Sequence, residues 1–254
     1  MQRVLVVPAA GLGSRLKATL PKALVPVAGR PMIDHLLALF HPWAHAAVVV
    51  AHPSFSDRIS AHVRHAWRDR MRVEVVEQAA PTGMLDAILA ASAAVERLTA
   101  ERVWTVWCDQ VGLLPATLER LAAAERTAPA PALVLPTVHR ADPYIHFARA
   151  ADNRIVAVLQ RREHDAMPAS GESDVGLFAL SRVAYLDELP RFAREVAPGA
   201  GTGERNFLPF IPWLAARVPV ATVPCTDPRE SQGVNTPDEL RLVEDWLLAR
   251  SDRP

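Results

Sequence analysis

The sequence predicts an α/β fold, in which helices flank a mostly parallel sheet and a smaller mixed lobe follows. Through the first half of the chain, short β-branched runs alternate with amphipathic segments of helical length, the pattern of a parallel sheet covered on both faces. In the second half, extended pieces separated by polar turns with Gly or Pro replace this alternation. The chain has 254 residues, 50% of them hydrophobic, so it can bury a large core without disulfides.

The predicted elements of the first half alternate between strand and helix. Strands are expected at residues 4–7, 46–50, 73–76, 103–108 and 133–137. Helices are expected at residues 31–40, 83–95 and 115–126. In the first helix, Pro31 suits the first helical position. The apolar residues behind it form one stripe at helical spacing, made by Met32, Ile33, Leu36, Leu37 and Phe40.

The second half begins with short extended segments and ends in a helix. Extended structure is expected at residues 147–150, 155–159 and 175–179, a helix at 206–216 and a strand at 220–223. The last helix starts at Thr236, where Thr236, Pro237 and Glu239 match a capping box with proline at the first helical position. We expect a single domain over residues 1–254, with two halves that meet at about residue 140.

Composition excludes several classes of function. Basic and acidic residues balance at 28 each, so no long-range field favours a nucleic-acid backbone or an anionic membrane. Cys108 and Cys225 show no metal-ligand spacing and fit a reduced, cytoplasmic protein. Neither a secretory leader nor an apolar run of about 18 residues occurs, so we expect no membrane span. The sequence leaves the oligomeric state open.

The loop after the first strand predicts phosphate binding. Glycines at this place let backbone N–H groups approach phosphate oxygens at the open end of a parallel sheet. Arg15 adds a forked donor and Lys22 a mobile point charge, which suit oxygens whose charge grows during group transfer. The glycines taken alone fit a purely conformational turn equally well. The small residues of the predicted loop are Ala9, Ala10, Gly11, Gly13 and Ser14.

Two familiar phosphate-binding loops do not fit this stretch. In a dinucleotide-binding loop, a third small residue should follow Gly11-Leu12-Gly13, but Leu16 stands there. Pro21 and Pro26 also interrupt any helix that follows. A P-loop is excluded because the GxxxxGK[ST] pattern does not occur.

Residues 6–32 as a whole resemble the signature of the sugar-phosphate nucleotidyltransferase family. The matching residues are Ala9, Ala10, Gly11, Gly13, Ser14, Arg15, Leu16, Pro21, Lys22, Leu24, Pro26, Val27, Gly29, Pro31, Met32 and Ile33. The resemblance is closest to the uridylyltransferase branch and extends over nearly the whole chain. It implies a Rossmann-like nucleotide-binding half, at about residues 1–140, and an acceptor-binding lobe with closing helices, at about residues 141–254. It also implies that Arg15, Lys22 and Asp109 are catalytic.

The resemblance also implies residues for the base and for Mg²⁺. Gln78 and Gly83 would read the base of the nucleotide, and Met84 departs from the small polar residue usual after that glycine, which leaves the base open. Asp109 ends a strand at the sheet edge where ligands bind, and would ligate Mg²⁺ with Asn235. A strand-end turn at Asp109 and turn chemistry at Asn235 are the structural alternatives.

The residues implied for the acceptor depart most from the family pattern. They are His146, Gln160, Asp174, Gly176 and Glu204. Gln160 stands near an expected glutamate and Asp174 near an expected asparagine, so we expect an acceptor other than N-acetylglucosamine 1-phosphate. Arg161 and Arg162 are either solvated surface charges or contacts of the acceptor phosphate.

The implied enzyme transfers a nucleotidyl group from UTP, dTTP or CTP to a sugar 1-phosphate or a similar phosphorylated acceptor and releases pyrophosphate, with Mg²⁺ as cofactor. One alternative is a cytidylyltransferase that acts on a non-sugar phosphate or a phosphonate. Another is a non-catalytic nucleotide-binding regulator, against which the joint presence of Lys22, Asp109 and Asn235 argues. The sequence lacks the repeat domain of bifunctional acetyltransferase relatives, so we expect one activity.

Overall fold

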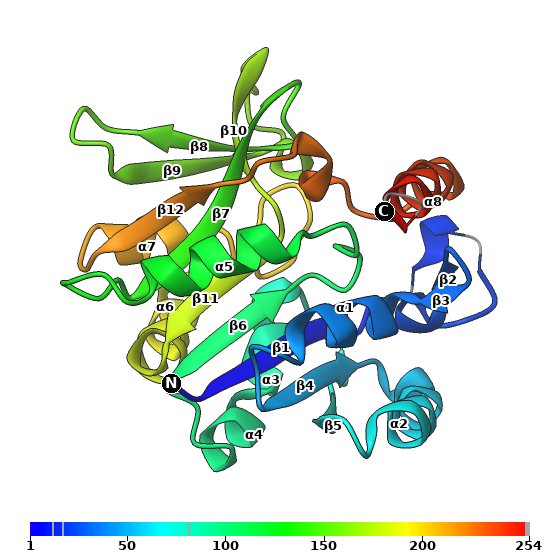
Figure 1. Cartoon of the computed structure of the whole chain (residues 1–254). Helices are drawn as coiled ribbons and strands as arrows, with labels where there is room; N and C mark the ends of the chain where they lie inside the picture. The colour runs from blue at the N-terminus through cyan, green and yellow to red at the C-terminus, as the bar shows by residue number, and fades with distance from the viewer. Residues whose placement is uncertain (12, 17, 81, 252–254) are drawn as a thin grey trace.

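An eight-stranded mixed sheet forms the centre of the protein (Figure 1). The computed structural model describes residues 1–11, 13–16, 18–80 and 82–251. Leu12 of the glycine loop and Pro81, before the predicted base-reading helix, lie outside these residues. The order of the strands along the sheet is β10-β7-β11-β6-β1-β4-β5, and β12 also pairs with β7.

The parallel part of the sheet is built by the first strands, as the sequence predicts. They are β1 (Arg3–Ala9), β4 (Ala46–Ala51), β5 (Arg72–Glu77) and β6 (Arg102–Val106). Strand β1 lies between β4 and β6 and is parallel to both. Every residue of β1, β4 and β6 is buried. Both faces of these strands are covered, so the strands appear in the sequence as continuous apolar runs.

The later strands extend the same sheet, mostly in antiparallel pairs. They are β7 (Leu133–Ala141), β10 (Ser170–Asp174), β11 (Leu177–Ser181) and β12 (Val220–Pro224). Strands β10 and β11 pair with successive parts of β7, and β11 also pairs antiparallel with β6. Strands β8 (Ile145–Arg149) and β9 (Ile155–Gln160) form a separate antiparallel hairpin, which lies beside β10 and above β12 in Figure 1. The α/β class is therefore confirmed, and among the described strands of the predicted mixed lobe β8 and β9 lie outside the main sheet.

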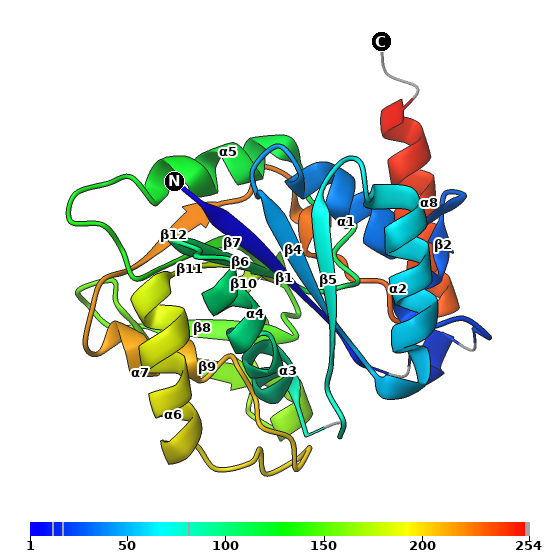
Figure 2. The same ribbon diagram turned by 90° about the horizontal axis from the view of Figure 1, so that it is seen from below.

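Helices cover both faces of the sheet (Figure 2). Helices α1 (Met32–Phe40), α2 (Pro53–Trp67) and α5 (Pro115–Ala124) share one hydrophobic core with the strands. Helices α3 (Met84–Ala90), α4 (Ser92–Arg97), α6 (Leu189–Glu195) and α7 (Phe210–Ala215) share the core of the opposite face. None of the described helices is long and apolar enough to span a bilayer.

The C-terminal helix packs on the N-terminal loop. Helix α8 (Pro237–Ser251) shares a small core with Leu16, Val27 and Met32, next to the short pair β2 (Pro26–Val27) and β3 (Arg30–Pro31). The predicted capping box is present: Glu239 N donates to Thr236 Oγ1 at 3.2 Å, and Thr236 N donates to Glu239 Oε2 at 2.9 Å. The remaining short helices are Ser14–Leu16, Lys22–Leu24, Arg161–Glu163, the π-helix Ala184–Glu188 and Pro228–Ser231.

Some predicted helix boundaries are wrong. The helix expected at 83–95 is interrupted at Ala91, where ψ is −7° and the chain passes from α3 into α4. The helix expected at 206–216 begins only at Phe210, because Asn206 is held by a side-chain contact to Glu163. Pro31 is the residue before α1 rather than its first residue.

Candidate active site

A cavity of about 790 Å³ opens where the parallel strands β1 and β6 end. This is the edge of an open α/β sheet at which ligands bind. The residues of the sequence prediction that line it are Ala9, Ala10, Gly11, Gly13, Arg15, Lys22, Gln78, Gly83, Asp109, Gln160, Asp174, Glu204 and Asn235. The structure thus brings residues from both ends of the chain into one cavity. The side chain of Ser14 lies outside the described part of the structure.

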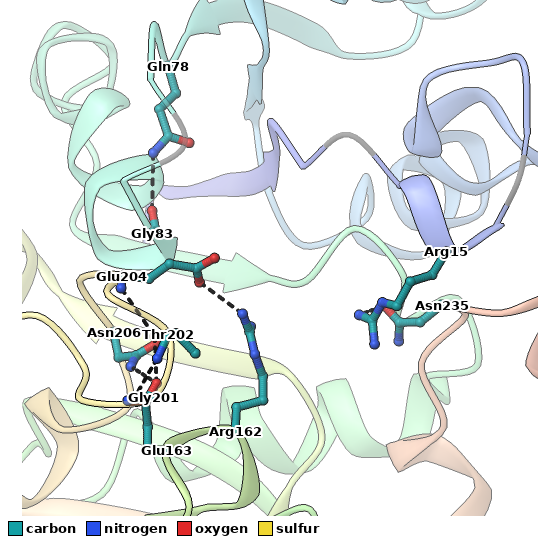
Figure 3. Close-up of polar contacts among 10 residues, drawn as sticks. All are labelled: Arg15, Gln78, Gly83, Arg162, Glu163, Gly201, Thr202, Glu204, Asn206 and Asn235. Carbon is teal, nitrogen blue, oxygen red and sulfur yellow. Dashed lines mark hydrogen bonds and ion pairs between the residues drawn. The ribbon is translucent and has the colours of Figure 1, made fainter.

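Lys22 contacts both candidate metal ligands. Its Nζ donates to Asp109 Oδ2 at 2.6 Å and to Asn235 Oδ1 at 2.8 Å. Arg15 Nη2 lies 3.4 Å from the same Asn235 oxygen (Figure 3). The side chains of Lys22 and Asp109 are only 16% and 15% exposed, so this ion pair is weakly screened by solvent.

The donor set fits Mg²⁺. A carboxylate and an amide oxygen converge here, and Val234 N donates to Asp109 O at 3.2 Å, which joins the loops that carry the two candidate ligands. Mg²⁺ is usually held by one or two protein oxygens together with substrate phosphates. Asp109 and Asn235 would supply the protein oxygens.

Gly13 places the phosphate loop against Lys22. Its φ of +63° favours glycine, and a Cβ at this position would lie 3.2 Å from Lys22 Cβ. Leu16 N donates to Gly13 O at 2.9 Å and closes the turn. The close backbone approach therefore explains why glycine stands beside the lysine.

Gln78 and Gly83, the predicted base-reading residues, contact each other. Gln78 Nε2 donates to Gly83 O at 3.1 Å (Figure 3). Gly83 has a φ of +126°, and a Cβ there would lie 2.5 Å from Arg205 O. Arg205 N donates to Thr82 O at 2.7 Å, and Leu85 N donates to Arg205 O at 3.0 Å. The predicted base-reading segment is thereby fixed to the segment that carries Glu204.

Asp174, predicted for the acceptor, brings a buried carboxyl group to the cavity. Gly176 N donates to Asp174 Oδ2 at 2.9 Å. Burial is the main cause that raises the pKa of Asp174 to about 6; the negative charge of Asp109 acts in the same direction, and this hydrogen bond acts against it. Gly176 lies behind the wall of the cavity, where a Cβ would lie 2.6 Å from both Gln110 Cγ and Trp107 Cδ1. Gly176 therefore shapes the site without lining it.

Other residues predicted for the acceptor lie at different depths. The Gln160 side chain lines the cavity, and its backbone N–H is fixed by Asp165 Oδ2 at 2.8 Å. His146 is outside the set of lining residues; its ring packs on Gly171 and contacts Glu172 O at 3.3 Å. The role predicted for His146 stays a prediction, and this placement makes it a support of strand β10.

Glu163 holds the loop at residues 199–206 in place and was missed by the sequence prediction. Its carboxylate accepts hydrogen bonds from Thr202 Oγ1 at 2.6 Å, Gly201 N at 2.7 Å and Asn206 Nδ2 at 2.8 Å (Figure 3). These bonds lower the pKa of Glu163 to about 2, with the Thr202 hydroxyl as the main cause. A lone glutamate in a polar turn gives no sequence signal of this contact.

The arginines around the acceptor side differ in their partners. Arg161 pairs with Asp142, and Arg162 Nη2 lies 3.2 Å from Glu204 Oε2. Arg140, at the end of β7, lines the cavity and donates to Ser231 Oγ at 3.3 Å, and its charge offsets a small part of the rise in the pKa of nearby Asp174. Within the described ranges no carboxylate forms an ion pair with Arg140. The sequence prediction missed this residue because it lies in a polar strand end.

The glycine loop, the lysine beside two candidate oxygen ligands and the open end of the parallel sheet together fit an α/β nucleotidyltransferase class of site. A family model described as the MobA-like NTP transferase domain matches residues 5–188. The chain belongs to this family, and the nucleotidyltransferase class predicted from the sequence is confirmed.

Curated relatives resemble the chain over nearly its full length. The Bifunctional protein GlmU of Pseudomonas syringae pv. syringae (strain B728a) is 30% identical over 254 residues, which cover 98% of the chain and 52% of that relative. The proteins of the same name from Pelotomaculum thermopropionicum and Xylella fastidiosa (strain M12) are 27% and 26% identical, each over 98% of the chain and 53% and 52% of the relative. The chain spans about half the length of the curated relatives it matches.

Proposed function

We propose that the protein transfers a nucleotidyl group from UTP, dTTP or CTP to a sugar 1-phosphate or a similar phosphorylated acceptor in the cytoplasm, with Mg²⁺ as cofactor. Pyrophosphate is the second product. The single observation that carries the proposal is the contact of Lys22 Nζ with both Asp109 and Asn235 in the cavity. Family membership supports the reaction class.

An oxygen of the acceptor phosphate attacks the α-phosphorus of the nucleotide. A new P–O bond forms while the bond to the pyrophosphate oxygen breaks, and pyrophosphate leaves with the bonding electrons. Lys22 and Arg15 compensate the negative charge on the crowded phosphates. Asp109 and Asn235 would hold Mg²⁺, whose charge adds to this stabilisation when it is bound.

Arg140 is our candidate for the acceptor phosphate. Arg161 and Arg162 already pair with carboxylates, whereas Arg140 offers a guanidinium with spare donors on the cavity wall near Asp174. A planar fork of donors matches phosphate oxygens. Gln78 and Gly83 are the corresponding candidates for the base, since both line the cavity and are joined by a hydrogen bond.

The test measures pyrophosphate release and product mass. The purified protein is incubated with Mg²⁺, each common nucleoside triphosphate in turn, and a panel of sugar 1-phosphates, phosphocholine and a phosphonate. Turnover confined to a pyrimidine nucleotide and one acceptor is the expected result, and the identity of that acceptor separates a sugar-phosphate enzyme from a cytidylyltransferase of non-sugar phosphates. Nucleotide binding without turnover across the panel would contradict the proposal and favour a regulator.

A further inference from the structure

Gln110 carries a side-chain amide whose oxygen is buried and has no hydrogen-bond partner in the described part of the protein. The residue follows Asp109, is only 7% exposed and lines the cavity. Its backbone is fixed, because Gln110 N donates to Trp107 O at 3.1 Å. Its Oε1 is buried and unpartnered among the residues that the structure describes, and its amide nitrogen donates to none of them.

The position of this amide distinguishes it from other unpartnered polar groups. Burying an amide without a partner costs free energy, so native proteins keep such groups rarely and often for a ligand. Of the residues with a buried unpartnered side-chain atom in the described ranges, Gln110 alone lines the cavity. Thr105, in the fully buried strand β6, carries a comparable unpartnered atom away from it.

The amide lies on the acceptor side. Gly176 packs directly on the Gln110 side chain, and the same segment carries Asp174, whose carboxyl group lines the cavity. Gln110 is also adjacent to Asp109, the candidate metal ligand. The Gln110 side chain therefore lies beside the segment that carries Asp174, and its backbone continues directly from the candidate metal ligand.

We propose that Gln110 determines acceptor specificity by hydrogen-bonding a hydroxyl group of a polyhydroxylated acceptor phosphate, a sugar or polyol phosphate. The inference rests on the proposed function. An amide presents one donor end and one acceptor end, and a hydroxyl can satisfy either. A quaternary ammonium group can satisfy neither in this way, so a phosphocholine acceptor would leave the amide unpaired.

The test compares Gln110→Met with wild type and with the control Thr105→Val. Both substitutions remove a buried unpartnered polar group, but only Gln110 lines the cavity. Initial rates are measured with sugar 1-phosphates, their monodeoxy analogues and phosphocholine at saturating nucleotide. We expect Gln110→Met to lower kcat/KM for the sugar phosphate by about 10- to 100-fold. The KM for the nucleotide should change by less than about twofold. The monodeoxy analogue that lacks the hydroxyl bound by Gln110 should react more slowly than the sugar phosphate with wild type, but at the same rate as the sugar phosphate with the variant.

Thermal unfolding gives a second measurement. The Tm of Gln110→Met should equal or exceed that of wild type, because an unpartnered amide is replaced by an apolar side chain of similar size. The Tm of Thr105→Val should likewise equal or exceed that of wild type, and its kcat/KM for the acceptor should be unchanged. A lower Tm, together with an equal loss of kcat/KM for the acceptor and for the nucleotide, would assign a structural role to Gln110. Unchanged acceptor kinetics, or phosphocholine as the preferred acceptor, would also overturn the inference.

The same samples separate failure of the inference from failure of the proposed function. If wild type turns over no acceptor, the proposed function fails. The change of Tm on addition of sugar 1-phosphates then tests whether Gln110 recognises a hydroxyl group. A Tm increase in wild type and Thr105→Val that is lost in Gln110→Met supports hydroxyl recognition without turnover. No increase in any of the three proteins overturns it.

Discussion

Lys22 is the residue on which the proposed chemistry depends most. Its ammonium group donates to Asp109 and Asn235 at 2.6 and 2.8 Å, so it lies where the phosphates and the metal would meet. We predict that Lys22→Met lowers the rate of pyrophosphate release by roughly a hundredfold or more, a loss of a few kcal/mol of transition-state stabilisation. Circular dichroism should show unchanged secondary structure.

The control for this prediction is Arg68→Met, which removes an exposed cation whose side chain is 76% exposed and lies outside the cavity. It should retain the wild-type rate. Lys22→Arg keeps the charge but changes the point charge into a planar fork, so we expect partial activity. Near-normal turnover in Lys22→Met would remove the basis of the mechanism.

Gly83 is constrained by its backbone and by its neighbour. Alanine at this position would place a Cβ 2.5 Å from Arg205 O in a conformation with a φ of +126°. We predict that Gly83→Ala destabilises the fold by about 1–3 kcal/mol and raises the KM for the nucleotide, because the segment at Arg205 must shift. Urea unfolding and initial rates measure the two effects.

Gly29 provides the matched control. It has a φ of +75°, but a Cβ there meets no atom within 4 Å. Gly29→Ala should therefore show only the conformational cost of about 1–2 kcal/mol, without a change in the KM for the nucleotide. An equal rise of this KM in both variants would contradict a specific role of Gly83.

At the scale of elements, the buried strands were the most predictable. Strands β1, β4 and β6 are covered by helices on both faces, so each of them appears in the sequence as a continuous apolar run. Helix α2 (Pro53–Trp67) was not predicted. Its first turn is capped by His52, whose Nδ1 accepts from Ser54 N at 3.1 Å, and histidine is not among the residues that usually signal a helix start.

The loop at residues 199–206 depends on one carboxylate. Glu163 accepts hydrogen bonds from Gly201, Thr202 and Asn206, and these bonds lower the pKa of Glu163 to about 2 from an ordinary value of 4.5. An acid with a lowered pKa in the folded state stabilises the fold fully above its unfolded pKa. This contribution is lost as the pH falls from about 4.5 through 2.

We predict that Glu163→Gln lowers the Tm at pH 7 and raises the KM for the acceptor, because the loop carries Glu204 into the cavity. The difference in Tm from wild type should shrink as the pH is lowered below about 4.5. Asp69→Asn is the control, since Asp69 is 83% exposed and pairs only with the exposed Arg68 within the described ranges. A pH-independent difference would show that the negative charge of Glu163 is not the cause.

At the scale of the whole molecule, the cavity joins segments that are distant in the sequence. Arg15, Lys22, Asp109 and Asn235 were predicted together because each matches a family motif, and the structure places them in one cavity. Arg140 was not predicted, since nothing in a polar strand end indicates that β7 delivers it beside Asp174. A motif can be recognised from the order of residues along the chain. Contacts between polar residues outside the motifs depend on how the sheet and the hairpin pack.

Nucleotide binding should stabilise the whole molecule, because the cavity forms only when both halves of the chain are folded. With Mg²⁺ and a triphosphate at about a hundred times its Kd, the free energy of unfolding should rise by about 2.7 kcal/mol. We expect a larger increase of Tm with UTP, dTTP or CTP than with ATP or GTP, because Gln78 and Gly83 line the cavity and are our candidates for reading a pyrimidine base. Lys22→Met should lose most of this increase, since its charge no longer faces the phosphates, while Arg68→Met should keep it. Equal shifts with purine and pyrimidine nucleotides would contradict base reading at Gln78, and no shift with any nucleotide would contradict nucleotide binding in the cavity.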